Sequence, residues 1–240
     1  MRSLLIAAAL AAPSLAHAQS VTVGAEATTD ERRRGLSWSD GDPALSVDAA
    51  AGLAGFDVSA RAVTTRGSPR HAGADGVLDL EVARGFDLGV VSLRARAIGH
   101  LFAGAAGRQD YYEIGGLGSY TLGPVTLDAG ASYAPDQRAI GGDNLYLFAN
   151  ARAGIPATPF SVNAGVGRSS GSVDEPFQAA RLRPAGRYTD WRIGAAWVQS
   201  PFTLAVDYVG NDIDAQRIVS PLGDRANSGD RIVGRVRVDF

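Results

Sequence analysis

The chain has 240 residues, with 30 glycines, no cysteine and a formal net charge of −2 at neutral pH. The near-balanced charge argues against a dedicated nucleic-acid-binding protein, and the lack of cysteine excludes a disulfide framework and thiolate metal sites. Many glycines with few helix-length apolar periods predict an all-β chain.

The first residues have the organisation of an export signal. Arg2 gives a short basic start, residues 4–12 are apolar, and residues 16–18 form an A-x-A cleavage site. We therefore expect a cleaved signal peptide over residues 1–18 and a mature chain over residues 19–240. No apolar run of 18 or more residues follows in the sequence, so we expect no inner-membrane helix.

Segments in which apolar and polar residues alternate recur along the rest of the chain. Each is close to the length that a tilted strand needs to cross a bilayer, and their number is even. The pattern predicts a transmembrane antiparallel up-and-down β-barrel of about 12 strands. The segments are residues 21–28, 47–53, 56–62, 78–82, 91–97, 112–122, 125–132, 144–152, 160–164, 190–197, 202–208 and 231–240.

The connections between these segments alternate between short and long. Short periplasmic turns that alternate with long external loops are typical of outer-membrane barrels, whereas a soluble sandwich has no reason to sort its loops. The short connections are residues 54–55, 85–89, 123–124, 156–159 and 199–201, and the long ones are residues 31–43, 66–75, 103–109, 134–143, 169–187 and 209–229.

Aromatic residues gather at the two ends of the strands, as expected where an apolar band meets lipid headgroups. Those beside the short turns are Phe56, Phe86, Phe160, Trp197, Phe202 and Phe240, and those beside the long loops are Phe102, Tyr112, Tyr133, Tyr188, Trp191 and Tyr208.

The apolar face of each strand is expected to contact lipid, so the polar face points into the lumen. Acidic and basic side chains are mixed on that face, which leaves two interpretations open: a narrow conducting pore, or ion pairs that fill the barrel. The candidate lumen residues are Glu26, Asp48, Asp57, Arg61, Asp79, Glu81, Arg94, Arg96, Glu113, Asp128, Arg152, Asp190, Arg192, Asp207, Arg235 and Arg237.

The first long connection carries the most specific string of the chain, at residues 32–45. Its motif positions are Arg34, Gly35, Ser37, Ser39, Gly41, Pro43 and Ala44. The string resembles a segment of the proteobacterial TorF-type putative porin family, with departures at Glu31, Arg33 and Trp38. The resemblance implies a small outer-membrane barrel with a porin-like role, and it implies no catalytic residue or substrate.

The three arginines Arg32, Arg33 and Arg34 of this string allow three interpretations. They are able to bind lipopolysaccharide phosphates, to fold inward as a constriction, or to form a solvated basic loop tip. We favour the solvated tip on the sequence alone.

Catalysis and metal binding find little support. The expected mature chain has His71, in an expected loop, and His100, near an outer strand end. His100 has Asp110 or Ser119 as candidate partners, but neither histidine lies in a motif of known barrel enzymes. The aspartates at 40, 42, 212 and 214 do not match an EF-hand loop. We expect no enzyme, no cofactor and no metal.

The last ten residues end on Phe240, with Arg231, Arg235, Arg237 and Asp239 on one face. This segment resembles the closing strand of bacterial outer-membrane barrels, which implies recognition by the outer-membrane insertion machinery.

The sequence thus predicts a Gram-negative outer-membrane protein exported through a Sec-type signal peptide. The expected function is that of a porin for small polar solutes or ions. The alternative is a non-conducting structural or adhesive barrel acting through its loops, with a lipid A deacylase or phospholipase a distant third. Outer-membrane lipids and lipopolysaccharide are the expected surroundings, and nucleic acid is not an expected partner.

Overall fold

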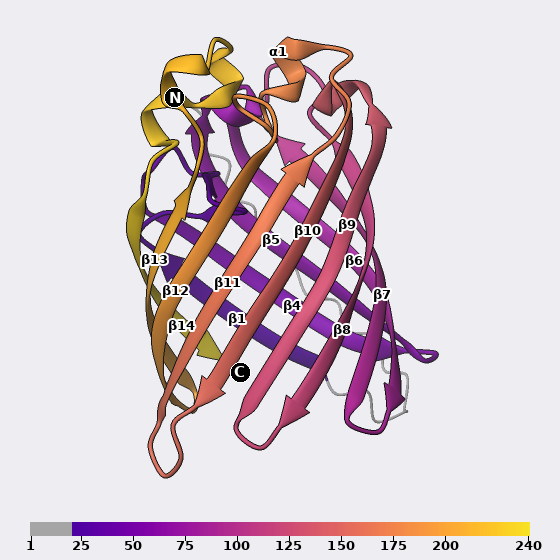
Figure 1. The fold of residues 1–240 in the computed structure, drawn as a ribbon, viewed down its shortest axis with the longest axis vertical. Helices are drawn as coiled ribbons and strands as arrows, with labels where there is room; N and C mark the ends of the chain where they lie inside the picture. Colours follow the sequence, from indigo (N-terminus) through magenta and orange to yellow (C-terminus); the bar gives the residue numbers. More distant parts are fainter. Residues whose placement is uncertain (1–20) are drawn as a thin grey trace.

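The structure is a computed structural model that describes residues 21–240 (Figure 1). The expected signal peptide lies outside these residues. Within them, twelve antiparallel strands close into one barrel in the order β1-β14-β13-β12-β11-β10-β9-β8-β7-β6-β5-β4. The strands are β1 Val21–Thr28, β4 Ala44–Leu53, β5 Phe56–Ser68, β6 Ala74–Leu88, β7 Val91–Ala103, β8 Tyr111–Leu122, β9 Val125–Gln137, β10 Gly142–Gly154, β11 Phe160–Ser170, β12 Tyr188–Gln199, β13 Phe202–Asn211 and β14 Arg231–Asp239. The predicted fold class is confirmed.

The barrel closes where the C-terminal strand meets the first one. Strand β14 pairs with β1 from Gly24 opposite Asp239 to Thr28 opposite Arg235. The other edge of β1 pairs with β4, from Val21 opposite Ala51 to Thr28 opposite Ala44. Full closure leaves the barrel no unpaired sheet edge, which is what a strand structure in lipid requires.

Alternation along the strands sorts the side chains as the sequence predicts. The apolar residues of the outward face are solvent-accessible in the isolated chain, for example Val21 at 61% and Ile232 at 70%. Val233, which interrupts the alternation of β14, is 4% exposed and points to the interior. The apolar girdle is therefore on the outside and the charges are inside.

The two ends of the barrel differ (Figure 1). At one end, here the turn end, short connections such as residues 54–55 and 123–124 join the strands. At the opposite end, the loop end, lie the long loops and the short helical segments. These segments are η1 Pro69–His71, η2 Arg138–Ile140, α1 Pro176–Ala179, η3 Ala215–Arg217, η4 Pro221–Gly223 and η5 Arg225–Asn227.

Two predictions of long loops, at residues 66–75 and 134–143, are wrong, because strands extend into both of these segments. Strand pairing continues to Ser68 opposite Ala74 and to Gln137 opposite Gly142, so only short helical turns separate β5 from β6 and β9 from β10. Beyond the apolar band a strand needs no lipid-facing apolar residues, so the alternation fades while the hydrogen-bonded ladder continues. Strand β6 likewise runs to Leu88, which shortens the predicted 85–89 turn.

Two residues assigned to the outer aromatic belt point inward instead. Tyr188 is 2% exposed, and Phe102 packs against a buried cluster inside the loop end. Both occupy lumen-facing positions in the alternation of their strands, so strand parity overrides proximity to a loop. The cluster comprises Trp38, Val63, Val77, Tyr111, Ala134, Ile140 and Leu182.

No helix in residues 21–240 is long and apolar enough to span a membrane.

Candidate functional site

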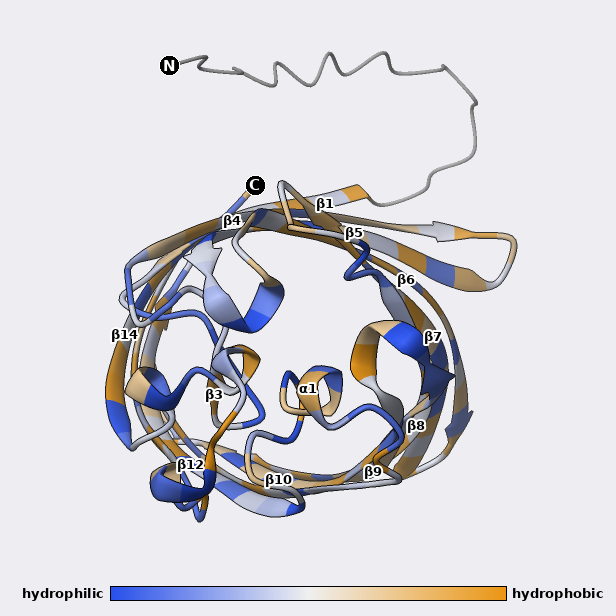
Figure 2. Cartoon of the chain, turned by 90° about the horizontal axis from the view of Figure 1, so that it is seen from above, coloured by the Kyte–Doolittle hydropathy of each residue, from blue (hydrophilic) through white to orange (hydrophobic). Residues whose placement is uncertain are grey.

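The first loop, residues 29–43, folds into the barrel rather than out into solvent. Seen from above, its short strand β3 lies inside the ring of barrel strands (Figure 2). Strands β2 Arg32–Arg33 and β3 Leu36–Ser37 pair as a hairpin. Its turn residues, Arg34 and Gly35, have φ of 52° and 74°, as tight hairpin turns require. The favoured prediction of a solvated loop tip is therefore wrong.

Buried hydrogen bonds hold the folded shape of this loop. The hydroxyls of Ser37 and Ser39 both donate to Asp30 Oδ1, at 2.7 and 3.2 Å. The amide of Gly41 donates to Ser37 Oγ at 2.8 Å. The two motif serines are fully buried, so they position the loop backbone and do not face a solute.

The arginines of the hairpin reach carboxylates on the barrel wall. Arg33 lies 2.8 Å from Asp79 on β6, and the Arg34 guanidinium donates to both oxygens of Glu113 on β8. Arg32 lies 3.3 Å from Asp30 of the same loop and also donates to the carbonyls of Asn227 and Gly229, at 3.3 and 2.7 Å. In the closed strand order β6 is three strands and β8 five strands from β1, so these ion pairs fasten the hairpin to the barrel wall away from β1. Of the three sequence interpretations, the inward constriction is the one that the structure shows.

The motif residues Gly35, Gly41, Pro43 and Ala44 shape the first loop and its contacts with neighbouring strands. A Cβ on Gly35 would lie 2.8 Å from Asp190 Cβ and 3.0 Å from the Gly210 carbonyl, so the hairpin tip touches β12 and β13. Gly41 has φ of 76°. The Pro43 carbonyl accepts from Arg66 Nε at 2.7 Å, and the buried Ala44 begins β4.

Two arginines that the sequence analysis did not single out join the loops above the hairpin. The buried Arg70 donates to the carbonyls of Ser37, Arg181 and Gly223 at 2.8, 2.8 and 3.0 Å. Arg181, equally buried, donates to the carbonyls of Arg70, Gln109 and Ala139 at 3.2, 3.0 and 2.6 Å. Burial lowers the pKa of Arg181 to about 10. We call the first loop, η1, residues 176–183 and η4 together the cap.

The histidines belong to the packing of this cap. His71 is buried 4.5 Å from the Trp38 ring, and burial with the nearby Arg181 and Arg70 holds its pKa well below the usual value. His100 contacts Asp79 Oδ1 through Nδ1 at 2.7 Å. The predicted partners of His100 are wrong, because Asp110 accepts from the Phe102 amide instead and Ser119 donates to Asp128.

Most of the predicted lumen charges meet an opposite charge. Arg61 lies 2.7 Å from Glu31 and 3.3 Å from Glu26. Arg94 bridges Asp57 and Glu81 at 2.5 and 3.2 Å. The charged residues of the predicted set that take part in ion pairs are Glu26, Asp48, Asp57, Arg61, Asp79, Glu81, Arg94, Arg96, Glu113, Asp207, Arg235 and Arg237.

The other four predicted lumen residues have different surroundings. Asp128 accepts a hydrogen bond from Ser119, and Asp190 accepts one from the Tyr146 hydroxyl at 3.1 Å. Arg152 and Arg192 line a cavity.

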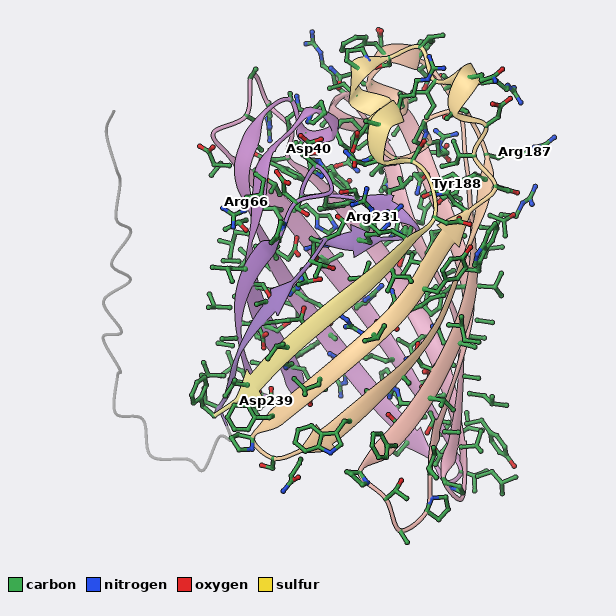
Figure 3. All side chains as sticks on the ribbon, turned by 90° about the vertical axis from the view of Figure 1, so that its left-hand side faces the viewer. Asp40, Arg66, Arg187, Tyr188, Arg231 and Asp239 are labelled. Atoms are coloured by element: carbon green, nitrogen blue, oxygen red, sulfur yellow. The ribbon has the colours of Figure 1, made fainter. Side chains whose placement is uncertain are left out.

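The lumen contains two adjoining cavities below the hairpin. One, of about 360 Å³, lies against residues 30–33 of the first loop. The second, of about 350 Å³, is lined by Arg152, Asn163 and other residues of β10–β13 toward the turn end. The two share Glu26, Arg192, Arg235 and Arg237. Along this interior β14 runs from Arg231 near the loop end to Asp239 at the turn end (Figure 3).

The chain belongs to a bacterial family described as "Bacterial protein of unknown function (Gcw_chp)", which matches residues 11–236. No curated protein matches the sequence.

Solved structures resemble the barrel at low sequence identity. The KdgM porin has a TM-score of 0.58 at 7% identity, covering 91% of this chain and 99% of that one. A structure described as "Unveiling the Mechanism Behind the in-meso Crystallization of Membrane Proteins" has a TM-score of 0.52 at 10% identity, covering 91% and 83%. LpxR from Salmonella typhimurium has a TM-score of 0.49 at 11% identity, covering 91% and 99%. At these identities the likeness shows the fold alone, which is that of outer-membrane barrels.

Proposed function

We propose that the chain is an outer-membrane porin that passes small polar solutes or ions by diffusion through a narrow charged lumen. The observation that carries the proposal is the pair of adjoining cavities, which are lined by arginines, carboxylates and amides inside a barrel with an apolar exterior. An interior of this kind suits water and polar solutes, whereas a purely structural barrel has no need of it.

The first loop supplies the constriction in this proposal. Its hairpin crosses the lumen between the cavities and the loop end, fastened by Arg33–Asp79 and Arg34–Glu113. A loop that narrows the lumen sets the size of solute that passes. The likeness of the fold to the KdgM porin and the motif at residues 32–45 support a TorF-type porin as the finer assignment.

Single-channel recording in planar bilayers tests the proposal. Purified barrel should give discrete conductance steps, and polar solutes added to the bath should reduce the step size if they enter the lumen. Recordings without steps from a preparation shown to be folded would refute it.

The cap favours a second candidate function, a non-conducting barrel that acts through its loops. Arg70 and Arg181 bind carbonyls of several loops, and an apolar cluster around Trp38 fills the loop end. Swelling of proteoliposomes in polar solutes separates the two functions, because a sealed barrel admits none of them.

The location and partners are part of the proposal. It comprises export by the signal peptide, recognition of the C-terminal strand by the insertion machinery, and insertion among outer-membrane lipids and lipopolysaccharide, and the barrel fold supports the outer-membrane location. The turn end then faces the periplasm and the loop end the exterior. Arg32, Arg33 and Arg34 pair with carboxylates of the loop and the wall, so lipopolysaccharide contacts fall to other residues of the loop end.

We propose no catalytic role. His100 is buried between Asp79 and the Tyr111 ring, whose centroid lies 4.5 Å from its own, and this enclosure favours a packing role.

A further inference from the structure

Two arginines of the lumen stand apart from the rest. Across residues 21–240, Arg152 and Arg192 have no carboxylate within ion-pair distance, although both are exposed to the cavity near the turn end. The other candidate lumen arginines each have at least one carboxylate partner: Arg61, Arg94, Arg96, Arg235 and Arg237.

We propose that this cavity is a binding site for solutes that bear carboxylate or phosphate groups, with Arg152 and Arg192 as the residues that hold the oxyanion. The inference rests on the proposed porin function and names the class of solute. A guanidinium presents paired donors that match the oxygens of a carboxylate or phosphate, and an unpaired one is free to do so.

Strand register places the two arginines around a common polar surface. Arg152 on β10 is opposite Asn163 on β11, and Arg192 on β12 is opposite Gly165 on β11. Asn163 and Gly165 are two residues apart, so all four positions face the lumen. Two strand spacings and this offset separate the Cα atoms of the arginines by roughly 12 Å, which lets both side chains reach one small solute.

Gly165 makes room between them for an amide. Asn150 is opposite Gly165 on β10, and a Cβ added to the glycine would lie 2.3 Å from Asn150 Oδ1. Asn150, Asn163 and Ser161 all line the cavity, so hydroxyl and amide donors and acceptors accompany the two guanidinium groups. The cavity, of about 350 Å³, is in the size range of small-molecule sites.

The charge balance of the cavity favours anions. Its lining holds four arginines, Glu26 and Asp128. Arg235 and Arg237 are neutralised by Asp207 and Asp48, each at 2.6 Å, and Glu26 is neutralised by Arg61 at 3.3 Å. Arg152 and Arg192 therefore face the single carboxylate of Asp128. Positive charge in a cavity with low-dielectric walls raises the local concentration of anions.

Ion selectivity tests the proposal directly. In a potassium chloride gradient across a planar bilayer, the wild-type barrel should show a reversal potential of the sign that anion permeation gives. The variant Arg152→Gln/Arg192→Gln should lose this preference. The variant Arg108→Gln/Arg138→Gln is the matched control, because it removes the same charge from exposed loop-end residues that do not line the lumen cavities. Equal reversal potentials in all three proteins would overturn the proposal.

Calorimetric titration of the barrel in detergent micelles gives a second readout that does not need an open channel. Citrate and inorganic phosphate, titrated separately, distinguish a carboxylate site from a phosphate site. Loss of the charge-assisted hydrogen bonds should weaken binding by roughly tenfold or more in Arg152→Gln/Arg192→Gln and leave the control unchanged. No binding of either anion to the wild type overturns the inference, whereas binding without conductance refutes the porin proposal alone.

Discussion

The ion pair between Arg34 and Glu113 should respond unequally to removal of its two partners. The Glu113 side chain is 3% exposed, and the Arg34 side chain is 21% exposed. Arg34→Met leaves a carboxylate buried without its partner, which costs about 3–5 kcal/mol of docking free energy. Glu113→Gln leaves a guanidinium that still lies over the Tyr146 ring, 4.5 Å from its centroid, and reaches water. Its cost should be smaller, about 1–2 kcal/mol.

Hydrogen exchange at the Trp38 amide measures this docking. That amide donates to the Glu31 carbonyl at 2.7 Å inside the folded loop, so its protection reports the closed hairpin. Arg34→Met should lose more protection than Glu113→Gln, and the double variant should lose less than the sum of the two. Equal losses, or unchanged protection in Arg34→Met, would show that this ion pair does not fasten the hairpin to the barrel wall.

Three further predictions concern the cap. Gly35→Ala should lower the free energy of unfolding in urea by about 1–3 kcal/mol, because the added methyl group meets β12 and β13. Gly55→Ala, at φ of 81° with open space around it, should lower it only by the cost of backbone strain. Equal losses in the two variants would contradict the close approach at the hairpin tip. The pKa of His71 is lower in the folded than in the unfolded chain, so below pH 6.5 the unfolded chain takes up a proton first. The free energy of unfolding should therefore fall by about 1.4 kcal/mol for each pH unit below 6.5. Unfolding at pH 7.5 and at pH 5.5 measures this fall, and His71→Leu should make it smaller. Arg181→Met should lower the free energy of unfolding by about 3 kcal/mol, about 1 kcal/mol for each of the three carbonyls left unpaired. The exposed control Arg187→Met should lower it by less than about 0.5 kcal/mol. Equal thermal unfolding of the two variants in micelles would show that the cap does not stabilise the barrel.

The barrel itself follows from the sequence because a strand in lipid must repeat with a period of two. That rule fixes which residues face outward, and it even places Val233 inside as the exception. It also explains where the aromatic assignment failed, since Phe102 and Tyr188 have the lumen-facing parity that their nearness to a loop obscured.

The cap was not predictable in the same way. A run of three arginines gives the same sequence pattern whether the side chains are solvated or bound to the barrel wall. Their partners Asp79 and Glu113 are distant in sequence, so no local spacing indicates the ion pairs. Arg70 and Arg181 bind backbone carbonyls, which every residue offers, so no side-chain pattern marks them. Ser37 and Ser39 were singled out as motif positions, but their shared acceptor, Asp30, was not, because a side-chain hydrogen bond across a loop leaves no periodic pattern in the sequence.

In the proposed pore, the hairpin folded into the barrel narrows a charged lumen. Single-channel conductance of the wild type, compared with that of a variant in which a two-glycine turn replaces residues 32–37, measures this narrowing. We expect small conductance steps for the wild type and clearly larger ones for the variant, because the variant lacks the hairpin that crosses the lumen. Identical conductance in the two proteins, each shown to be folded, would contradict it.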